Sequence, residues 1–196
     1  MKKKTGLYFG SFNPIHNGHL IIAEQILENS DLKEIWFVVS PHNPLKERQT
    51  LLNDHQRLVM VKVAIDDNPA FRASDIEFNL PKPSYTIHTL VHLENKYPTH
   101  EFCLIIGSDN LNSITKWFNY EQLLNNYKLY VYPRPGYDGG EFKNHQNVVW
   151  VEAPLIEISS SYIRKSIAEG KQVRYLLPTK VYEYILEMHF YQKRVP

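Results

Sequence analysis

Two histidines stand three residues apart in the segment GSFNPIHNGHL, with Gly18 between His16 and His19 and Pro14 before them. Residues three apart share one face of a helical turn, so both imidazoles can reach the same space beside the free N–H groups of a helix start. The N-terminus of a helix favours an anion. The segment therefore predicts a binding site for phosphate.

Three interpretations compete for this pair of histidines. Either residue taken alone is most simply a helix cap or a core side chain without chemistry. A zinc site needs three or four ligands, and the chain has a single cysteine, Cys103, and no acidic partner close to the pair. The third interpretation, which we favour, is that imidazole N–H groups hold phosphoryl oxygens as charge builds in a transition state.

A second group of residues suited to phosphate lies in ISSSYIRK, residues 158–165. Three serines precede an expected helix, and Arg164 follows Ser160 by four residues, on the same face one turn later. Serine oxygens and the N–H groups of a first turn suit phosphate, and a guanidinium can bind two of its oxygens at once. The alternative interpretation is an ordinary serine cap beside a surface arginine.

Both groups need a scaffold, and the pattern of the chain predicts an α/β fold. Short apolar runs rich in β-branched and aromatic residues alternate with helical patterns, as in a parallel sheet. Three central strands, covered on both faces, are expected at residues 5–9, 34–39 and 101–106, and two more at 128–132 and 147–151. We predict a Rossmann-like parallel sheet flanked by helices, with a small C-terminal helical part, and residues 1–196 as a single domain.

Several segments combine helical spacing of apolar residues with signals for a helix start or stop. The expected helices are residues 19–27, a helix after Asn53 with Gln56 completing a capping box, a helix capped by Ser84 that runs to about Tyr97, residues 160–169 before Gly170, and residues 178–188. The histidine segment therefore links the first strand to the first helix. Open parallel sheets bind ligands at such carboxyl ends of their strands.

Composition excludes several classes of function. Lys and Arg number 22 against 21 for Asp and Glu, so the chain lacks the basic excess expected of a protein that binds nucleic acid or an anionic membrane. No apolar run is long enough to span a membrane. A single cysteine fits a reducing compartment, which predicts a cytoplasmic protein. The oligomeric state stays open, and a homo-oligomer is one alternative.

At this point the two groups resemble known motifs. HNGH, with Gly10, Phe12, Asn13 and Pro14 before it, resembles the HxGH signature of the nucleotidyltransferase superfamily, and ISSSYIR resembles its ISSTxIR signature with Ser161 in place of threonine. The resemblance implies that His16, His19 and Arg164 are catalytic. It also implies an ATP-binding set of Gly10, Ser11, Phe12, Asn13, His16, His19, Gly107, Asp109, Ser159, Ser160 and Arg164.

Two further segments resemble bacterial nicotinate-nucleotide adenylyltransferases. SYTIHTL, residues 84–90, is similar to their SYTxDTL segment, and IGSDNLNSITKW, residues 106–117, to their GxDxxxxxxxW stretch. In that family the Asp lies near the adenosine and the Trp stacks on the pyridine ring, although Trp117 alone would more simply be a core residue. The implied acceptor-binding residues are Lys46, Ser84, Tyr85, Thr86, Trp117, Phe118 and Arg134, of which Lys46 is equally well explained as a solvated loop lysine.

The resemblance implies transfer of AMP from ATP to nicotinate mononucleotide, giving nicotinate adenine dinucleotide and pyrophosphate. Magnesium would bridge the ATP oxygens, with no metal ligand set in the protein itself. The sequence departs from the family at His88, where aspartate is usual, and at Phe118, where a tyrosine often stands. Because histidine titrates near neutrality, His88 predicts an acceptor affinity that depends on pH.

Other activities stay open at this point. Nicotinamide mononucleotide differs from the acid at one group, and phosphopantetheine is the acceptor of related adenylyltransferases. A nucleotide-binding sensor with the same fold and no reaction is the alternative outside the enzymes. His16, His19, Ser160 and Arg164 argue against it, because a site without catalysis has no need of all four.

Overall fold

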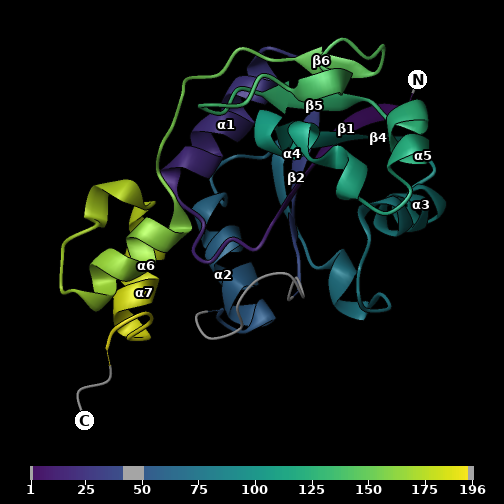
Figure 1. The fold of residues 1–196 in the computed structure, drawn as a ribbon. Helices are drawn as coiled ribbons and strands as arrows, with labels where there is room; N and C mark the ends of the chain where they lie inside the picture. The colour runs from purple at the N-terminus through teal and green to yellow at the C-terminus, as the bar shows by residue number, and fades with distance from the viewer. Residues whose placement is uncertain (1, 42–50, 194–196) are drawn as a thin grey trace.

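A computed structural model describes residues 2–41 and 51–193 of the chain. Its centre is a six-stranded parallel sheet in the order β3-β2-β1-β4-β5-β6 (Figure 1), which confirms the predicted Rossmann-like α/β fold. The strands are β1 (Lys3–Gly10), β2 (Glu34–Val39), β3 (Phe71–Ser74), β4 (His100–Gly107), β5 (Leu129–Tyr132) and β6 (Val148–Trp150).

The three predicted central strands are confirmed as β1, β2 and β4, and the two further ones as β5 and β6. Every residue of β2 is buried, as expected for a strand covered on both faces. The sequence pattern missed β3, an edge strand of four residues, FRAS, that is mostly not buried. A strand so short, with one large apolar side chain, carries too little periodicity to be recognised.

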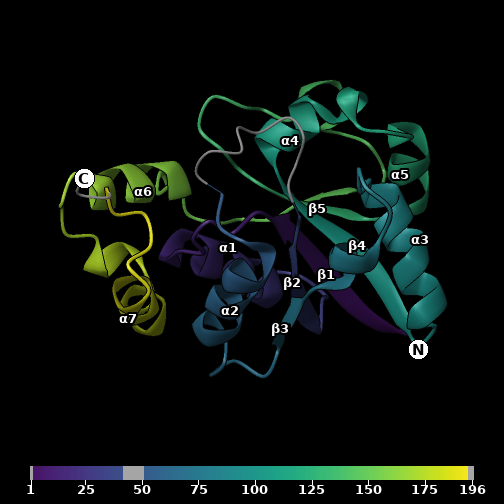
Figure 2. The ribbon, with the colours of Figure 1, turned by 90° about the horizontal axis from the view of Figure 1, so that it is seen from below.

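Helices cover both faces of the sheet (Figure 2). One buried cluster joins α1 and α2 to one face, and a second joins α3, α4 and α5 to the other. The helices are α1 (Asn17–Glu28), α2 (Asp54–Ala64), α3 (Thr86–Lys96), α4 (Ser108–Asn112), α5 (Tyr120–Asn126), α6 (Ser160–Ala168) and α7 (Thr179–Glu187), with 3-10 turns η2 (Ile76–Asn79), η3 (Ile114–Lys116), η4 (Gly140–Phe142) and η5 (Arg174–Leu176).

Most helix starts follow the predicted signals. Asn53 and Gln56 form the expected capping box at the start of α2, and Gly170 follows α6 with a positive φ of 73°. The prediction that Ser84 caps α3 is wrong, because Tyr85 occupies that position and makes no side-chain cap. The Ser84 side chain instead lies near the carboxyl group of Glu77, where it opposes the rise in pKa that burial causes. The short helices α4 and α5 were not predicted.

The C-terminal helical part is formed by α6, α7 and η5, to one side of the sheet (Figure 1). Ile163 of α6 and Val181 and Ile185 of α7 are buried in the same apolar cluster as α1 and α2. This packing places the start of α6 against the loop that follows β1. No helix among residues 2–41 and 51–193 has the length and apolar character needed to cross a membrane.

Candidate active site

The candidate active site lies where the carboxyl ends of neighbouring parallel strands meet. The loop after β1 carries the histidine segment, Gly107 ends β4 and precedes Asp109 in α4, and Arg134 follows β5 by two residues. Because β1, β4 and β5 are adjacent in the sheet, these loops share one edge. This edge is where open α/β sheets bind ligands.

The two histidines share one face, as their spacing predicts. His16 is the N-cap of α1 with an extended backbone, and His19 is the third residue of the helix. Their rings stack with centroids 3.7 Å apart and an interplanar angle of 26°. The backbone N–H of His16 donates to Nδ1 of His19 at 3.2 Å. Nδ1 of His19 is therefore an acceptor, which leaves the proton of a neutral ring on Nε2.

Both imidazoles are held in the neutral form. Burial, and next the positive charge of Arg134, lower the pKa of His16 to about 4. Burial also places the pKa of His19 well below the usual value of 6.5, with further lowering from His16 and Arg134. At neutral pH the pair therefore offers N–H groups as hydrogen-bond donors rather than two positive charges.

Gly18 allows this close approach of the histidine ring to the chain. A Cβ atom on Gly18 would lie 2.9 Å from Cγ2 of Ile156 and 3.1 Å from Nδ1 of His16. Any larger residue would therefore displace the His16 ring or the Ile156 side chain. Close packing at this turn therefore explains why a glycine stands between the two histidines.

The second predicted group docks directly on the first. Nη1 of Arg164 donates to the carbonyl oxygen of Asn13 at 2.8 Å, and Oγ of Ser160 donates to the carbonyl oxygen of Pro14 at 2.9 Å. The serine-rich helix start and the histidine loop, nearly 150 residues apart in the sequence, thus form one unit. In this structure these donors bind backbone, and their contacts with ATP phosphates stay a prediction.

The other residues predicted for ATP lie in the same loops. Gly10 ends β1 and Ser11 follows it, while Ser159 caps α6 by accepting a backbone N–H at 3.2 Å. The ring of Phe12 is buried edge-on against His19, with centroids 5.2 Å apart. Only the backbone of Phe12 can therefore face a ligand, and its φ of 44° is unusual for a residue other than glycine.

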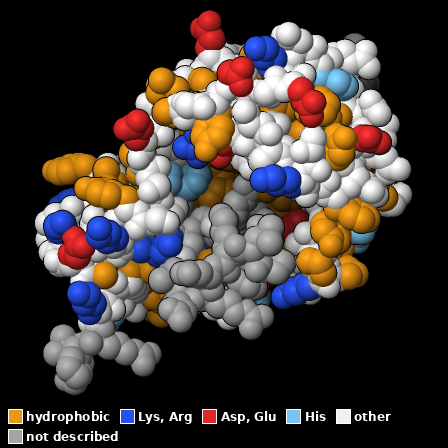
Figure 3. All heavy atoms as spheres, in the orientation of Figure 1, with side chains coloured by type: hydrophobic (Ala, Val, Ile, Leu, Met, Phe, Trp, Pro, Cys, Tyr) orange, Lys and Arg blue, Asp and Glu red, His pale blue; other side chains and the backbone are white. Residues whose placement is uncertain are grey.

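Arg134 lies beside the histidine pair, close enough for its charge to lower the pKa of both rings. Its Nε atom is 3.9 Å from Oδ1 of Asp109, too far for a hydrogen bond. Within the described part of the chain, both of these buried atoms lack a hydrogen-bond partner. Figure 3 shows histidine and Lys or Arg side chains at the rim of a hollow between the C-terminal helices and the rest of the molecule.

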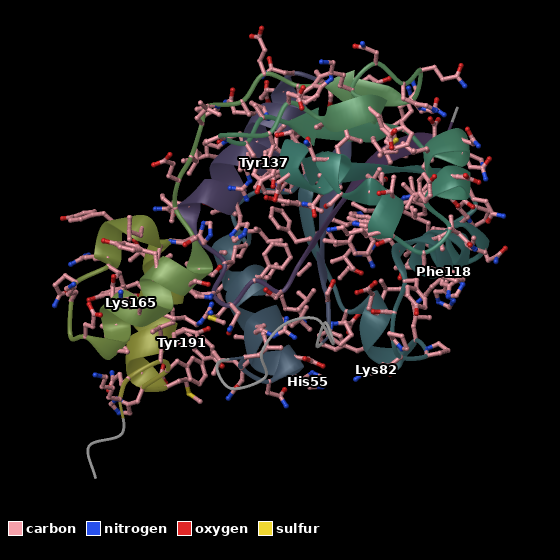
Figure 4. All side chains as sticks on the ribbon, viewed as in Figure 1. His55, Lys82, Phe118, Tyr137, Lys165 and Tyr191 are labelled. Atoms are coloured by element: carbon pink, nitrogen blue, oxygen red, sulfur yellow. The ribbon has the colours of Figure 1, made fainter. Side chains whose placement is uncertain are left out.

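Of the residues predicted for the acceptor, Arg134 lies beside the histidines, whereas Tyr85 and Phe118 lie together at the start of α3. Tyr85 stacks on Phe118 with centroids 4.5 Å apart, and His88 lies edge-on to both rings. Trp117 is partly buried against the core cluster beside α3 to α5. Figure 4 shows Phe118 far from Lys165 of α6. Ser84 and Thr86 flank Tyr85 in the chain, and Lys46 lies outside the described residues.

The chain is similar to known proteins of one family over nearly its whole length. The profile of the cytidylyltransferase-like family matches residues 7–166. A protein of Flavobacterium psychrophilum named probable nicotinate-nucleotide adenylyltransferase is 55% identical over 192 residues, covering 97% of this chain and 100% of the relative. The chain belongs to the nicotinate-nucleotide adenylyltransferase family. A relative of the same name from Bacteroides fragilis is 48% identical and covers 95% of this chain and 92% of its own length.

The fold of the adenylyltransferase family is also found among solved structures. The Plasmodium falciparum nicotinic acid mononucleotide adenylyltransferase complexed with NaAD has a TM-score of 0.81 and 21% sequence identity, covering 96% of this chain and 97% of that one. A crystal structure of a Vibrio parahaemolyticus protein described as a putative nicotinate-nucleotide adenylyltransferase has a TM-score of 0.73. At this identity the likeness supports the fold.

Sequence reasoning missed Arg57, which organises the loops of this family member. Its side chain is fully buried and donates to the carbonyl oxygens of Ser11, Ser40 (2.9 Å) and Leu52 (3.1 Å), and it forms an ion pair with Asp54. The carboxyl ends of β1 and β2 are thereby tied together. The available signal was an arginine at a core position of α2, three and four residues before buried apolar residues.

A second missed residue is Tyr191, which follows α7. Its hydroxyl donates to Oδ1 of Asn13 at 2.8 Å, and the N–H of Leu52 donates to the same oxygen at 3.3 Å. The end of the described chain therefore contacts the histidine loop. Figure 4 labels Tyr191, which follows α7. A single tyrosine after an amphipathic helix carries no pattern that could have predicted this contact.

Burial of a neutral His16 makes stability depend on pH. Because its pKa is about 4 in the folded protein, the unfolded chain takes up a proton below about pH 6.5 while the folded chain does not. The stabilisation present above about pH 6.5 is lost as the pH falls toward 4. We expect this group to lower the free energy of unfolding by about 2 kcal/mol between roughly pH 7 and pH 5.

Urea titrations of the parent and of His16→Asn at both pH values measure this effect. The variant should lose less stability on acidification, by that amount, because it removes the titrating group. Equal losses in the two proteins would mean that His16 is not held neutral by the fold.

Proposed function

We propose that this chain transfers the AMP unit of ATP to nicotinate mononucleotide, giving nicotinate adenine dinucleotide and pyrophosphate. The observation that supports it most is the docking of the ISSSYIR helix start on the HNGH loop through Ser160 and Arg164. Relatives 55% identical over almost the full chain carry the corresponding name. Residues 1–196 act in this proposal as one nucleotidyltransferase domain.

The acceptor itself supplies the nucleophile. A phosphate monoester with a second pKa near 6 is mostly dianionic at neutral pH, so no side chain needs to remove a proton from it. The protein therefore has to align the acceptor phosphate with the α-phosphorus of ATP and stabilise charge on the phosphoryl oxygens. In this proposal His16, Nε2–H of His19 and the guanidinium of Arg164 perform that task, and Arg134, beside the histidines, adds positive charge.

The two substrates occupy the two sides of the strand edge. ATP lies against the histidine loop and the start of α6, with its adenosine toward Gly107 and Asp109. A Cβ on Gly107 would collide with the Asp109 carboxylate, so glycine is required for that carboxylate to turn back over the strand end. The pyridine ring lies near Trp117 and Phe118, and the start of α3 meets its carboxylate.

Magnesium enters this proposal bound to the triphosphate, where it neutralises charge on the phosphate oxygens. Among the residues described, no group of three or more His, Cys, Asp or Glu side chains is close enough to hold a metal ion. A magnesium ion that keeps several water ligands and is coordinated mainly by substrate phosphates does not need such a group. The reaction also fits a cytoplasmic enzyme, and a homo-oligomer remains compatible with it.

Pyrophosphate release tests the proposal. The purified chain is given ATP and magnesium with nicotinate mononucleotide, nicotinamide mononucleotide or phosphopantetheine in parallel. We expect the acid to react at least about tenfold faster than the amide at equal concentration, the scale of one well-placed hydrogen bond to a charged group. Faster release with the amide or with phosphopantetheine would assign another acceptor, and no release with any of them would leave a nucleotide-binding protein without the reaction.

A further inference from the structure

A buried carboxylate near the acceptor segment has no part in the mechanism above. Glu77 lies in η2 with only 3% of its surface exposed. Oγ1 of Thr89 donates to Oε1 of Glu77 at 2.8 Å, and the side chains of Ser40 and Ser84 lie near this carboxyl group. Burial raises the pKa of Glu77, and these hydroxyl groups oppose the rise.

The three hydroxyls belong to segments that flank the proposed substrate sites. Ser40 directly follows β2, and its carbonyl oxygen accepts from Arg57, whose guanidinium also binds the carbonyl oxygen of Ser11 in the ATP loop. Ser84 precedes α3, and Thr89 lies one turn into it. Glu77 thus lies between the end of β2 and the start of α3, and it is hydrogen bonded to α3 through Thr89.

The start of α3 depends on such a connection because it lacks local support. Tyr85 at the N-cap makes no side-chain cap, and the first turn contains no acidic residue. Its first backbone N–H groups are therefore free of side chains that commonly satisfy them. Ile87, Leu90 and Leu93 pack the helix against the sheet, and the hydrogen bond from Thr89 to Glu77 adds a polar connection near its start.

We propose that Glu77 is a positioning residue for the acceptor: through the hydroxyl of Thr89 it holds the start of α3 at the distance from the ATP loop that the reaction needs. This inference rests on the proposed function, since it assigns the α3 start to the acceptor. Glu77 does not touch the substrate. It acts by fixing the site in advance, and a displacement of well under an ångström is enough to weaken binding.

Three variants test the connection. Thr89→Val removes one hydroxyl while keeping the shape of the side chain, Glu77→Gln keeps an acceptor oxygen, and Glu77→Ala removes the group. The matched control is Glu94→Gln, because Glu94 on the same helix accepts a hydrogen bond from the hydroxyl of Tyr127 at 3.0 Å. Steady-state kinetics are measured for each substrate separately, below the melting temperature of every variant.

We expect Glu77→Ala and Thr89→Val to raise the acceptor KM about tenfold while kcat and the ATP KM change less than about threefold. Glu77→Gln should recover part of the affinity, and Glu94→Gln should match the parent. A merely structural role would instead move the ATP KM, the acceptor KM and kcat together, or would lower the melting temperature without changing any of them. Either pattern would overturn the inference.

Calorimetric titration of nicotinate mononucleotide without ATP separates this inference from the proposed function. If the parent binds and converts the mononucleotide and the variants bind it equally well, the role of Glu77 is wrong and the function stands. If the parent binds it, the variants bind it more weakly and none of the proteins releases pyrophosphate, the positioning role stands and the proposed reaction fails. A parent that neither binds nor converts it overturns both.

Discussion

Replacing His19 with alanine is expected to lower kcat by roughly a hundredfold or more, the scale seen when one transition-state donor is removed. His19 is neutral, and its Nδ1 atom is committed to the backbone N–H of His16, so its free donor is Nε2–H. A neutral donor stabilises phosphoryl oxygens most as their charge increases. The loss should therefore fall on kcat more than on the KM for ATP.

His92→Ala is the matched control for this experiment. His92 lies exposed on α3, so the substitution removes the same side chain without touching the site. Single-turnover measurement of pyrophosphate release keeps product dissociation from masking the defect. A His19→Ala protein that stays folded and turns over within a fewfold of the parent would exclude His19 as a catalytic residue.

The sheet could be predicted largely because its central strands are buried on both faces. A strand such as β2, EIWFVV, reads as a nearly continuous apolar run, as expected for a strand buried on both faces. The edge strand β3 and the short helices α4 and α5 are set by contacts from distant parts of the chain. Their own residues carry too little pattern to reveal them.

The functional site, too, could be predicted only where local sequence determines it. Local spacing was enough to place His16 and His19 on one face, because both lie within one turn. It could not show that Arg164 binds the backbone of Asn13 in the free protein, since this contact depends on how α6 docks. Motif resemblance indicated that the two segments meet, but not by which bonds.

Buried polar groups were the least predictable part. Arg57 and Glu77 each satisfy their hydrogen bonds with carbonyl oxygens or hydroxyls from segments that only the tertiary fold brings together. The wrong expectation at Ser84 has the same origin. A serine before a helix is a common cap, but here its side chain lies near a buried carboxylate and Tyr85 takes the N-cap position.

Replacing Arg134 with methionine should have the second large effect, also roughly a hundredfold on turnover, because a guanidinium beside the reacting phosphates stabilises their charge. The substitution has a second expected consequence. Since the charge of Arg134 contributes to lowering the pKa of His16, the pKa of that ring should rise from about 4 in the variant. It should stay below the usual value, because burial is the larger cause.

A pH titration followed by NMR of ¹⁵N-labelled histidine measures the pKa, and pyrophosphate release measures turnover. Arg174→Met is the control, since it removes an equal charge from the exposed turn η5. If Arg134 acts as described, only Arg134→Met changes both readouts, because the same positive charge acts on the rings and on the phosphates. Slower turnover with an unchanged His16 pKa would place the guanidinium away from the histidines and restrict Arg134 to the acceptor side of the site.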